Sequence, residues 1–166
     1  QVYGIFGYCP GCRCENLQIY DANWSIVAKE IDKATDQRRQ LRRAYGDLVS
    51  MLEDFCNRKA AQLTTETANF QVLKEARKFF QEHAGVHILG CLEQQELLAL
   101  RRVFHKRHSC VHAGAKVTEK YIQMIPEDSK LAIGGPIPLS KEELVEGMTA
   151  MRKSLGVLVQ AIEQRG

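Results

Sequence analysis

The side chains best suited to chemistry lie together in the second half of the chain. Residues 101–114 contain three histidines, three arginines and one lysine, and they follow a stretch, residues 92–100, with the length and residue choice of a helix. At 3.6 residues per turn, a helix here presents two distinct faces. One face carries Leu100, Val103, Phe104, Arg107 and Val111. The other carries Arg101, His105, His108 and His112.

Three interpretations fit this helix end. Arg107 lies among apolar positions, where an unpaired charge is costly, so its guanidinium needs an anion or several hydrogen-bond acceptors. Arg107 and His112 then form a phosphate-handling pair, in which the arginine holds charge and the histidine moves a proton. Alternatively, His108 and His112 bind a metal, because the i, i+4 spacing places two imidazoles side by side. The third interpretation is a solvated basic helix end before Gly114, where cations suit the helix dipole.

The motif resembles the signature of the HEPN superfamily. The resemblance rests on Arg107-His108-x-x-x-His112, followed by Gly114 and by the run VTEKY at residues 117–121. Members of the superfamily carry an arginine, then a polar residue and, a few positions later, a histidine near the end of a core helix. Ala113 stands where an asparagine is common. The resemblance implies an all-helical fold and an endoribonuclease that cleaves RNA without a metal or other catalytic cofactor.

The resemblance also implies roles for single residues. The 2′-hydroxyl of RNA attacks the neighbouring phosphorus and leaves 2′,3′-cyclic phosphate ends. His112 serves as general base or acid, Arg107 stabilises the charge on the phosphoryl oxygens, and His108 orients the backbone or assists proton transfer. The residues expected to bind RNA beside this catalytic set are Arg101, Arg102, His105 and Lys106. The alternative function is a non-catalytic HEPN module that binds RNA or dimerises within a defence or toxin–antitoxin system.

Helical geometry constrains this site. Arg107 and His112 are about 140° apart on a straight helix, at 100° per residue, so the two side chains cannot reach one phosphate from a single copy. Either the helix unwinds around His112, as Ala113-Gly114 permits, or two copies share the site. The resemblance implies the second, because HEPN members commonly dimerise so that their motif helices meet. We therefore expect a homodimer.

The N-terminal residues, 1–20, are the one β-like part of the sequence. Residues 2–8 and 17–20 are aromatic and β-branched, and they flank the run CPGCRC at residues 9–14. A Cys-Pro-Gly-Cys turn between two short strands resembles the knuckle of a zinc ribbon, with Cys9, Cys12 and Cys14 as candidate ligands of a structural zinc. A closed site needs a fourth ligand from elsewhere. The alternative is a metal-free β-hairpin that caps the helices.

Residues 21–166 are predicted to form one helical domain, because their apolar residues step by three and four. The predicted helices run from Asp21 to about residue 60, from Thr64 to near Gly85, over 91–112, from Thr118, and from a capping box at Ser140 and Glu143. The predicted fold class is mainly α: a four- to five-helix antiparallel bundle of HEPN type with a small N-terminal β-hairpin.

Composition sets broad limits on the class of protein. The 166 residues are 45% hydrophobic and 26% charged, which suits one globular domain with a core. The net charge of +3 does not by itself indicate nucleic acid, and the block of four arginines at residues 38–43 is either a solvated face or a backbone-binding surface. Without a membrane-length apolar run or secretory features, the six cysteines predict reduced thiols in a cytoplasmic protein that does not enter membranes.

Overall fold

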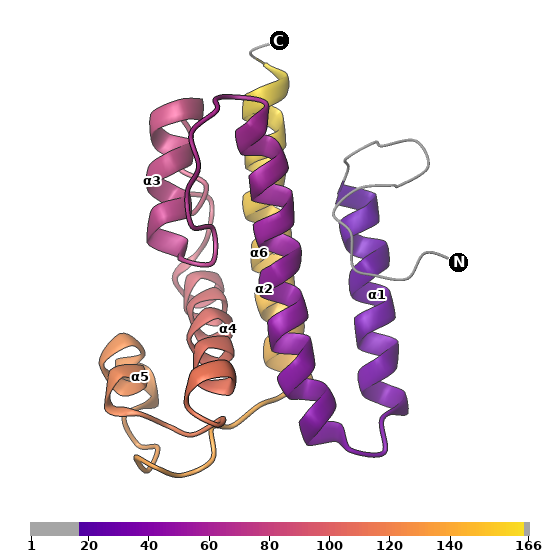
Figure 1. The fold of residues 1–166 in the computed structure, drawn as a ribbon, viewed down its shortest axis with the longest axis vertical. Helices are drawn as coiled ribbons and strands as arrows, with labels where there is room; N and C mark the ends of the chain where they lie inside the picture. The colour runs from indigo at the N-terminus through magenta and orange to yellow at the C-terminus, as the bar shows by residue number, and fades with distance from the viewer. Residues whose placement is uncertain (1–16, 165–166) are drawn as a thin grey trace.

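The computed structural model describes residues 17–164, which form a bundle of helices (Figure 1). The α-helices are α1 (Leu17–Lys33), α2 (Gln37–Ala61), α3 (Leu73–Ala84), α4 (Gln94–His112), α5 (Glu119–Met124) and α6 (Lys141–Glu163), and the 3₁₀ turn η1 spans Pro126–Asp128. Within this range there is no strand, and a single antiparallel bridge joins Lys116 to Pro136. The predicted mainly helical fold is therefore confirmed.

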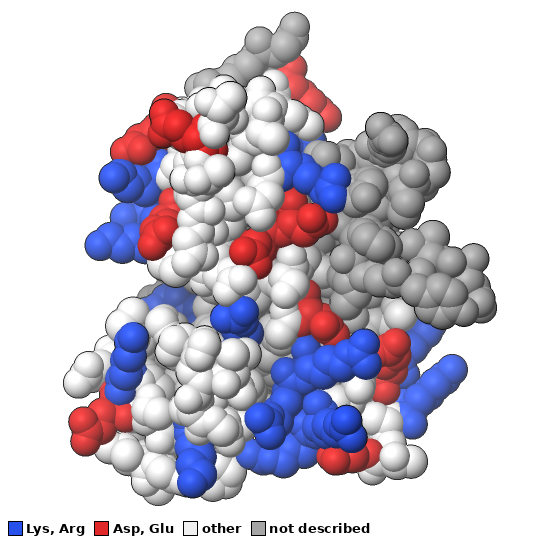
Figure 2. Space-filling view, viewed as in Figure 1, with Lys and Arg blue, Asp and Glu red and all other residues white. Residues whose placement is uncertain are grey.

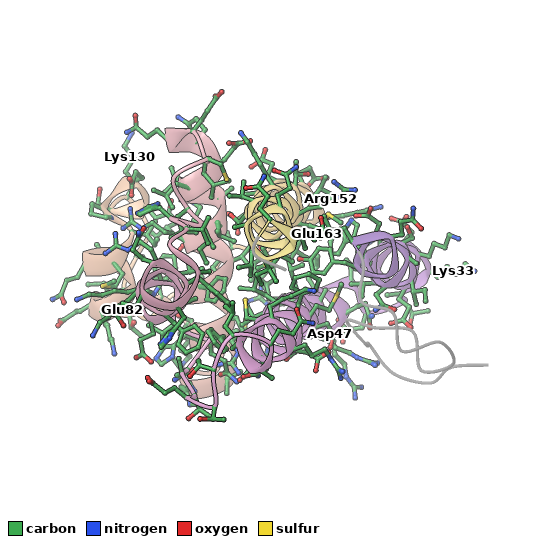
Figure 3. All side chains as sticks on the ribbon, turned by 90° about the horizontal axis from the view of Figure 1, so that it is seen from above. Lys33, Asp47, Glu82, Lys130, Arg152 and Glu163 are labelled. Carbon is green, nitrogen blue, oxygen red and sulfur yellow. The ribbon has the colours of Figure 1, made fainter. Side chains whose placement is uncertain are left out.

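Four long helices, α1, α2, α4 and α6, alternate in direction along the bundle (Figure 1). Seen along its length, α6 lies among α1, α2 and α4, and side chains fill the space between them (Figure 3). The largest fully buried side chains include Tyr20, Tyr45, Phe55, Phe80, Leu100 and Met151, one or more from each of the five helices α1, α2, α3, α4 and α6 that enclose the core. This shared core is what holds the antiparallel helices together.

Helices α4 and α6 approach each other closely at Gly147. A Cβ atom at this position would lie 2.4 Å from Cγ2 of Val103, which is shorter than any normal contact between carbon atoms. The glycine therefore lets α4 and α6 pack tightly at Val103.

The predicted helix from Asp21 to about residue 60 is wrong, because the structure divides it into α1 and α2. The Asp36 carboxylate accepts a hydrogen bond of 3.0 Å from the backbone N–H of Arg39 and so caps the start of α2. Aspartate favours such cap positions over helix interiors. Both helices bury their apolar stripes in one core, which explains why the periodicity continued across the break.

The N-terminal expectations have two outcomes. Residues 17–20, predicted as a strand, form the first turn of α1, so that strand is wrong and Asp21 is not the first helical cap. The remainder of the predicted β-hairpin, with the candidate zinc ligands Cys9, Cys12 and Cys14, lies outside the described residues.

The later helices follow their sequence signals more closely. Helix α3 begins at Leu73 rather than Thr64, but it ends as predicted before Gly85, whose φ of 63° is left-handed. Thr118 and Ser140 cap α5 and α6 as predicted, accepting hydrogen bonds from the backbone N–H groups of Tyr121 and Glu143. Among the helices of residues 17–164, none has the length and apolar character needed to cross a membrane.

Candidate functional site

Helix α4 positions the predicted catalytic residues on one continuous element. A capping box between Glu93 and Glu96 begins the helix, and it stays helical through His112. The backbone N–H groups of Ala113 and Ala115 both donate to the Ser109 carbonyl, and Gly114 and Ala115 adopt positive φ values of 61° and 59°. The helix therefore stays regular through His112 and ends after it, so of the two alternatives given above, the one in which the helix unwinds around His112 is wrong.

The buried face of α4 differs by about one residue from the predicted one. Lys106, Ser109 and Cys110 are buried, whereas Arg107 is half-buried and Val111 is 56% exposed. On this face Val103 packs against Gly147 and Lys106 pairs with Glu143, so both side chains face α6. The buried cation on this helix is Lys106, and not Arg107.

Lys106 is held by a buried ion pair with α6. Its Nζ lies 2.7 Å from Oε2 of Glu143, and the Tyr45 hydroxyl donates a 2.6 Å hydrogen bond to the other oxygen, Oε1. Burial, followed by the charge of Glu143, raises the pKa of Tyr45, so this hydroxyl stays protonated and donates. Glu143, predicted as part of a capping box, thus ties α2 and α4 to α6.

Arg102 forms a second internal ion pair. Its Nη2 lies 2.5 Å from Oδ1 of Asp128, and the Tyr121 hydroxyl donates to Oδ2 of the same carboxylate. Of the four residues predicted to bind RNA beside the catalytic set, Lys106 and Arg102 thus have internal partners. Arg101 and His105 line a surface groove, and the Arg101 guanidinium also donates to the Met124 carbonyl.

The predicted stripe of Arg101, His105, His108 and His112 does share one face of α4. His108 and His112 are both exposed, and their ring centroids are 4.7 Å apart with 47° between the ring planes. The pKa of His108 is lowered, first by partial burial and then by the charges of His112, Lys120 and Arg107. The pKa of His105 is lowered in the same way, first by burial and then by the charges of Arg101, His108 and Lys120. Both imidazoles are therefore favoured in their neutral form near pH 7.

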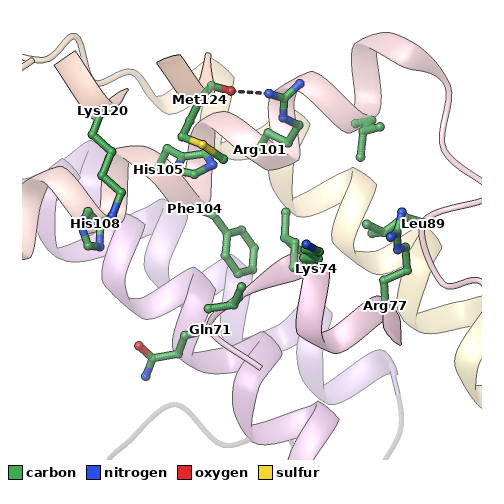
Figure 4. A pocket seen from close by; sticks show the side chains of 13 residues that line it. Gln71, Lys74, Arg77, Leu89, Arg101, Phe104, His105, His108, Lys120 and Met124 are labelled. Atoms are coloured by element: carbon green, nitrogen blue, oxygen red, sulfur yellow. Dashed lines mark hydrogen bonds between the residues drawn. The ribbon is translucent and has the colours of Figure 1, made fainter. Parts of the chain in front are cut away.

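A groove of about 530 Å³ opens beside this stripe, between α3, α4 and α5 (Figure 4). Its apolar lining comes from Val72, Leu73, Leu89, Leu97, Phe104 and Met124. Its basic lining comes from Lys74, Arg77, Arg101, His105, His108 and Lys120, and no aspartate or glutamate of residues 17–164 belongs to it. Sequence reasoning missed Lys74, Arg77 and Lys120. The i, i+3 spacing of Lys74 and Arg77 places them on one helix face, but no local signal connects that face with α4.

Arg107 lies away from this groove and has no hydrogen bond or ion pair with another described residue. Nearby, the Arg42 guanidinium donates a 3.2 Å hydrogen bond to the Cys110 carbonyl, which links the start of α2 to the end of α4. The arginines of residues 38–43 are exposed, and lysine and arginine side chains gather where α2 begins (Figure 2). The motif end of α4 therefore borders a basic surface.

The metal interpretation has only two ligands in the part of the chain that the structure describes. No group of three or more histidine, cysteine, aspartate or glutamate side chains there could hold an ion, so His108 and His112 lack a third such neighbour. Within residues 17–164, Cys56, Cys91 and Cys110 are free thiols. Burial raises the pKa of Cys56 and of Cys110, which keeps these two thiols protonated.

A comparison of the chain with protein-family models finds no match, and comparisons with curated proteins and with solved structures find none either. The HEPN resemblance therefore stays a prediction that rests on the motif residues of α4.

Proposed function

We propose that this protein is a metal-independent endoribonuclease of HEPN type that cleaves RNA beside His108 and His112. The observation that carries the proposal is the pair of imidazoles with ring centroids 4.7 Å apart, next to a groove whose charged lining, among the described residues, is entirely basic. RNA supplies both the phosphate that such a groove attracts and the 2′-hydroxyl nucleophile.

The reaction needs two proton transfers and stabilisation of charge. One neutral imidazole takes the proton of the 2′-hydroxyl as its oxygen attacks phosphorus. The bond from phosphorus to the 5′-oxygen then breaks, and the leaving oxygen receives a proton from the second imidazole, which enters the reaction protonated, so that a 2′,3′-cyclic phosphate and a 5′-hydroxyl result. His112 carries one transfer and His108 the other. The lowered pKa of His108 keeps this imidazole available as the base near pH 7.

Arg107 supplies the positive charge, and a second copy of the chain brings it to the reacting phosphate. Because α4 is continuous, Arg107 is about 140° from His112 around the helix. The half-buried Arg107 and the exposed Val111 one turn later offer the surface for a two-fold contact between motif helices. In this homodimer, Arg107 of one protomer and His112 of the other act on the same phosphate, where the planar guanidinium matches two phosphoryl oxygens.

The test is cleavage of single-stranded RNA by purified protein in EDTA. The parent and His87→Ala, which changes an exposed histidine outside the groove, should cleave equally and leave cyclic phosphate ends. Arg107→Ala and His112→Ala should each lose at least about 100-fold in rate. Full activity in both variants would contradict the assignment. RNA binding without cleavage by the parent would instead favour the non-catalytic RNA-binding module.

Mixing the two inactive variants tests the shared site. Half of randomly paired dimers contain one copy of each, and each such dimer holds one intact combination of Arg107 and His112. The mixture should therefore recover about a quarter of the parental activity. A mixture as inactive as its components would refute a site shared between two copies.

A further inference from the structure

The groove beside the histidine pair combines an apolar floor with a basic rim. Phe104 points from α4 into the groove, and Leu89 and Met124 also belong to its lining (Figure 4). The volume of about 530 Å³ falls within the range of sites that enclose a small ligand or one part of a larger one. The floor therefore suits a compact apolar or aromatic group.

Among the described residues, three cations of the rim lack the internal partners that hold other cations of this protein. Lys74, Arg77 and Lys120 make no hydrogen bond or ion pair with another residue in the described range. Arg101 is anchored, because its guanidinium donates to the Met124 carbonyl. Since no carboxylate of the described residues belongs to the lining, the rim carries an excess of positive charge and favours an anion.

The groove is also continuous with the catalytic pair, since His108 belongs to its lining and Lys120 reaches toward His108 (Figure 4). A group bound on the floor therefore lies directly beside the imidazoles. In an RNA chain, the group next to a reacting phosphate is the base of an adjoining nucleotide, which joins a flat apolar face to a phosphate.

We propose that this groove is a base-binding subsite, which takes one unpaired nucleotide of the RNA next to the cleaved phosphodiester. This inference rests on the proposed function in taking RNA as the ligand. The base lies on the floor near Phe104 and Met124, and the rim lysines and arginines hold its flanking phosphates. A base paired in a duplex cannot enter, so the subsite selects single-stranded positions for cleavage.

The test uses a fully 2′-O-methylated oligonucleotide, which binds but lacks the nucleophile, so that the result does not depend on cleavage. Met124→Trp should fill the groove and weaken binding at least about five-fold, because stacking of each base contributes that much or more. Val145→Trp is the matched control: Met124 is 41% exposed and Val145, on α6, is 42% exposed outside the groove. This control should bind within about two-fold of the parent.

The contribution of the basic rim to binding is tested with the same 2′-O-methylated oligonucleotide. Lys74→Glu should weaken binding at least about five-fold. Lys78→Glu should change it by less than about two-fold, because Lys78 lies on the same helix but outside the groove. An oligomer of sugar and phosphate alone, without bases, should bind the parent and Met124→Trp equally. The free mononucleotide AMP, as a second probe, shows whether the base and phosphate bind without the rest of the chain.

The outcomes separate this subsite from the nuclease activity. Unchanged binding of the base-bearing oligomer by Met124→Trp, or equal weakening of the oligomers with and without bases, would overturn the subsite. Circular dichroism of each variant excludes misfolding as the cause of weaker binding. If the protein binds the oligonucleotides as described but cleaves no RNA, the nuclease proposal is refuted and the base-binding subsite stands.

Discussion

Replacing Lys106 by methionine removes the ammonium of an ion pair that lies almost entirely out of water. The Lys106 side chain is 5% exposed and the Glu143 side chain 14%, with 2.7 Å between Nζ and Oε2. Methionine fills a similar volume, so the change removes charge and leaves little cavity. The Glu143 carboxylate is then left in a poorly solvated position with only the Tyr45 hydroxyl as donor.

The expected cost follows from this arrangement. Removing one partner of a buried ion pair costs about 3–5 kcal/mol of unfolding free energy. Tyr45 still donates its 2.6 Å hydrogen bond to Glu143, and water reaches part of that carboxylate, so we expect the lower end, about 3 kcal/mol. For a domain with a total stability of about 5–15 kcal/mol, this is a large loss.

Urea denaturation of Lys106→Met and of the double variant Lys106→Met/Glu143→Gln measures this cost. The double variant should recover more than half of the loss, because the glutamine is uncharged and keeps an acceptor for Tyr45. Lys120→Met is the control. It lies on the groove without an ion pair, so it should retain stability within about 0.5 kcal/mol and lose affinity for RNA. A Lys106→Met protein of parental stability with weakened RNA binding would refute the structural role.

Two further predictions concern protonation and packing. In an NMR titration, His105 and His108 should titrate below the ordinary histidine value of 6.5, because burial and the charges of Arg101, Lys120, Arg107 and His112 oppose protonation. The unfolded chain then binds more protons than the folded one, so these two histidines make the folded protein less stable as the pH drops below about 6.5. A measured pKa of 6.5 or higher for either histidine would contradict this prediction. Gly147→Ala should cost about 1–3 kcal/mol in urea denaturation, because the new methyl group meets Val103. Gly46→Ala, within α2 and with open space around it, should instead stabilise by about 0.5–1 kcal/mol, and equal effects would refute the packing argument.

Local sequence signals predicted the parts of the fold that depend on neighbouring residues. Thr118, Ser140 and Gly85 marked helix ends correctly, because capping and left-handed backbone are properties of a few adjacent residues. The break at residues 34–36 carried the same kind of signal in Asp36, but an apolar stripe that continues through the turn concealed it. Periodicity detects a buried face and does not detect a change of direction between two helices that share one core.

The candidate site also depends partly on local sequence and partly on the tertiary structure. The sequence by itself determined that Arg101, His105, His108 and His112 share one face of a helix, since that follows from 3.6 residues per turn. Only the tertiary structure decided that Lys106, rather than Arg107, is buried, because the rotation of α4 about its axis depends on how the helix packs against α6. Only the tertiary structure brought Lys74, Arg77 and Lys120 to the same groove as His108. These residues lie on three different helices, and the groove exists because the burial of a common core, rather than any local preference, places those helices side by side.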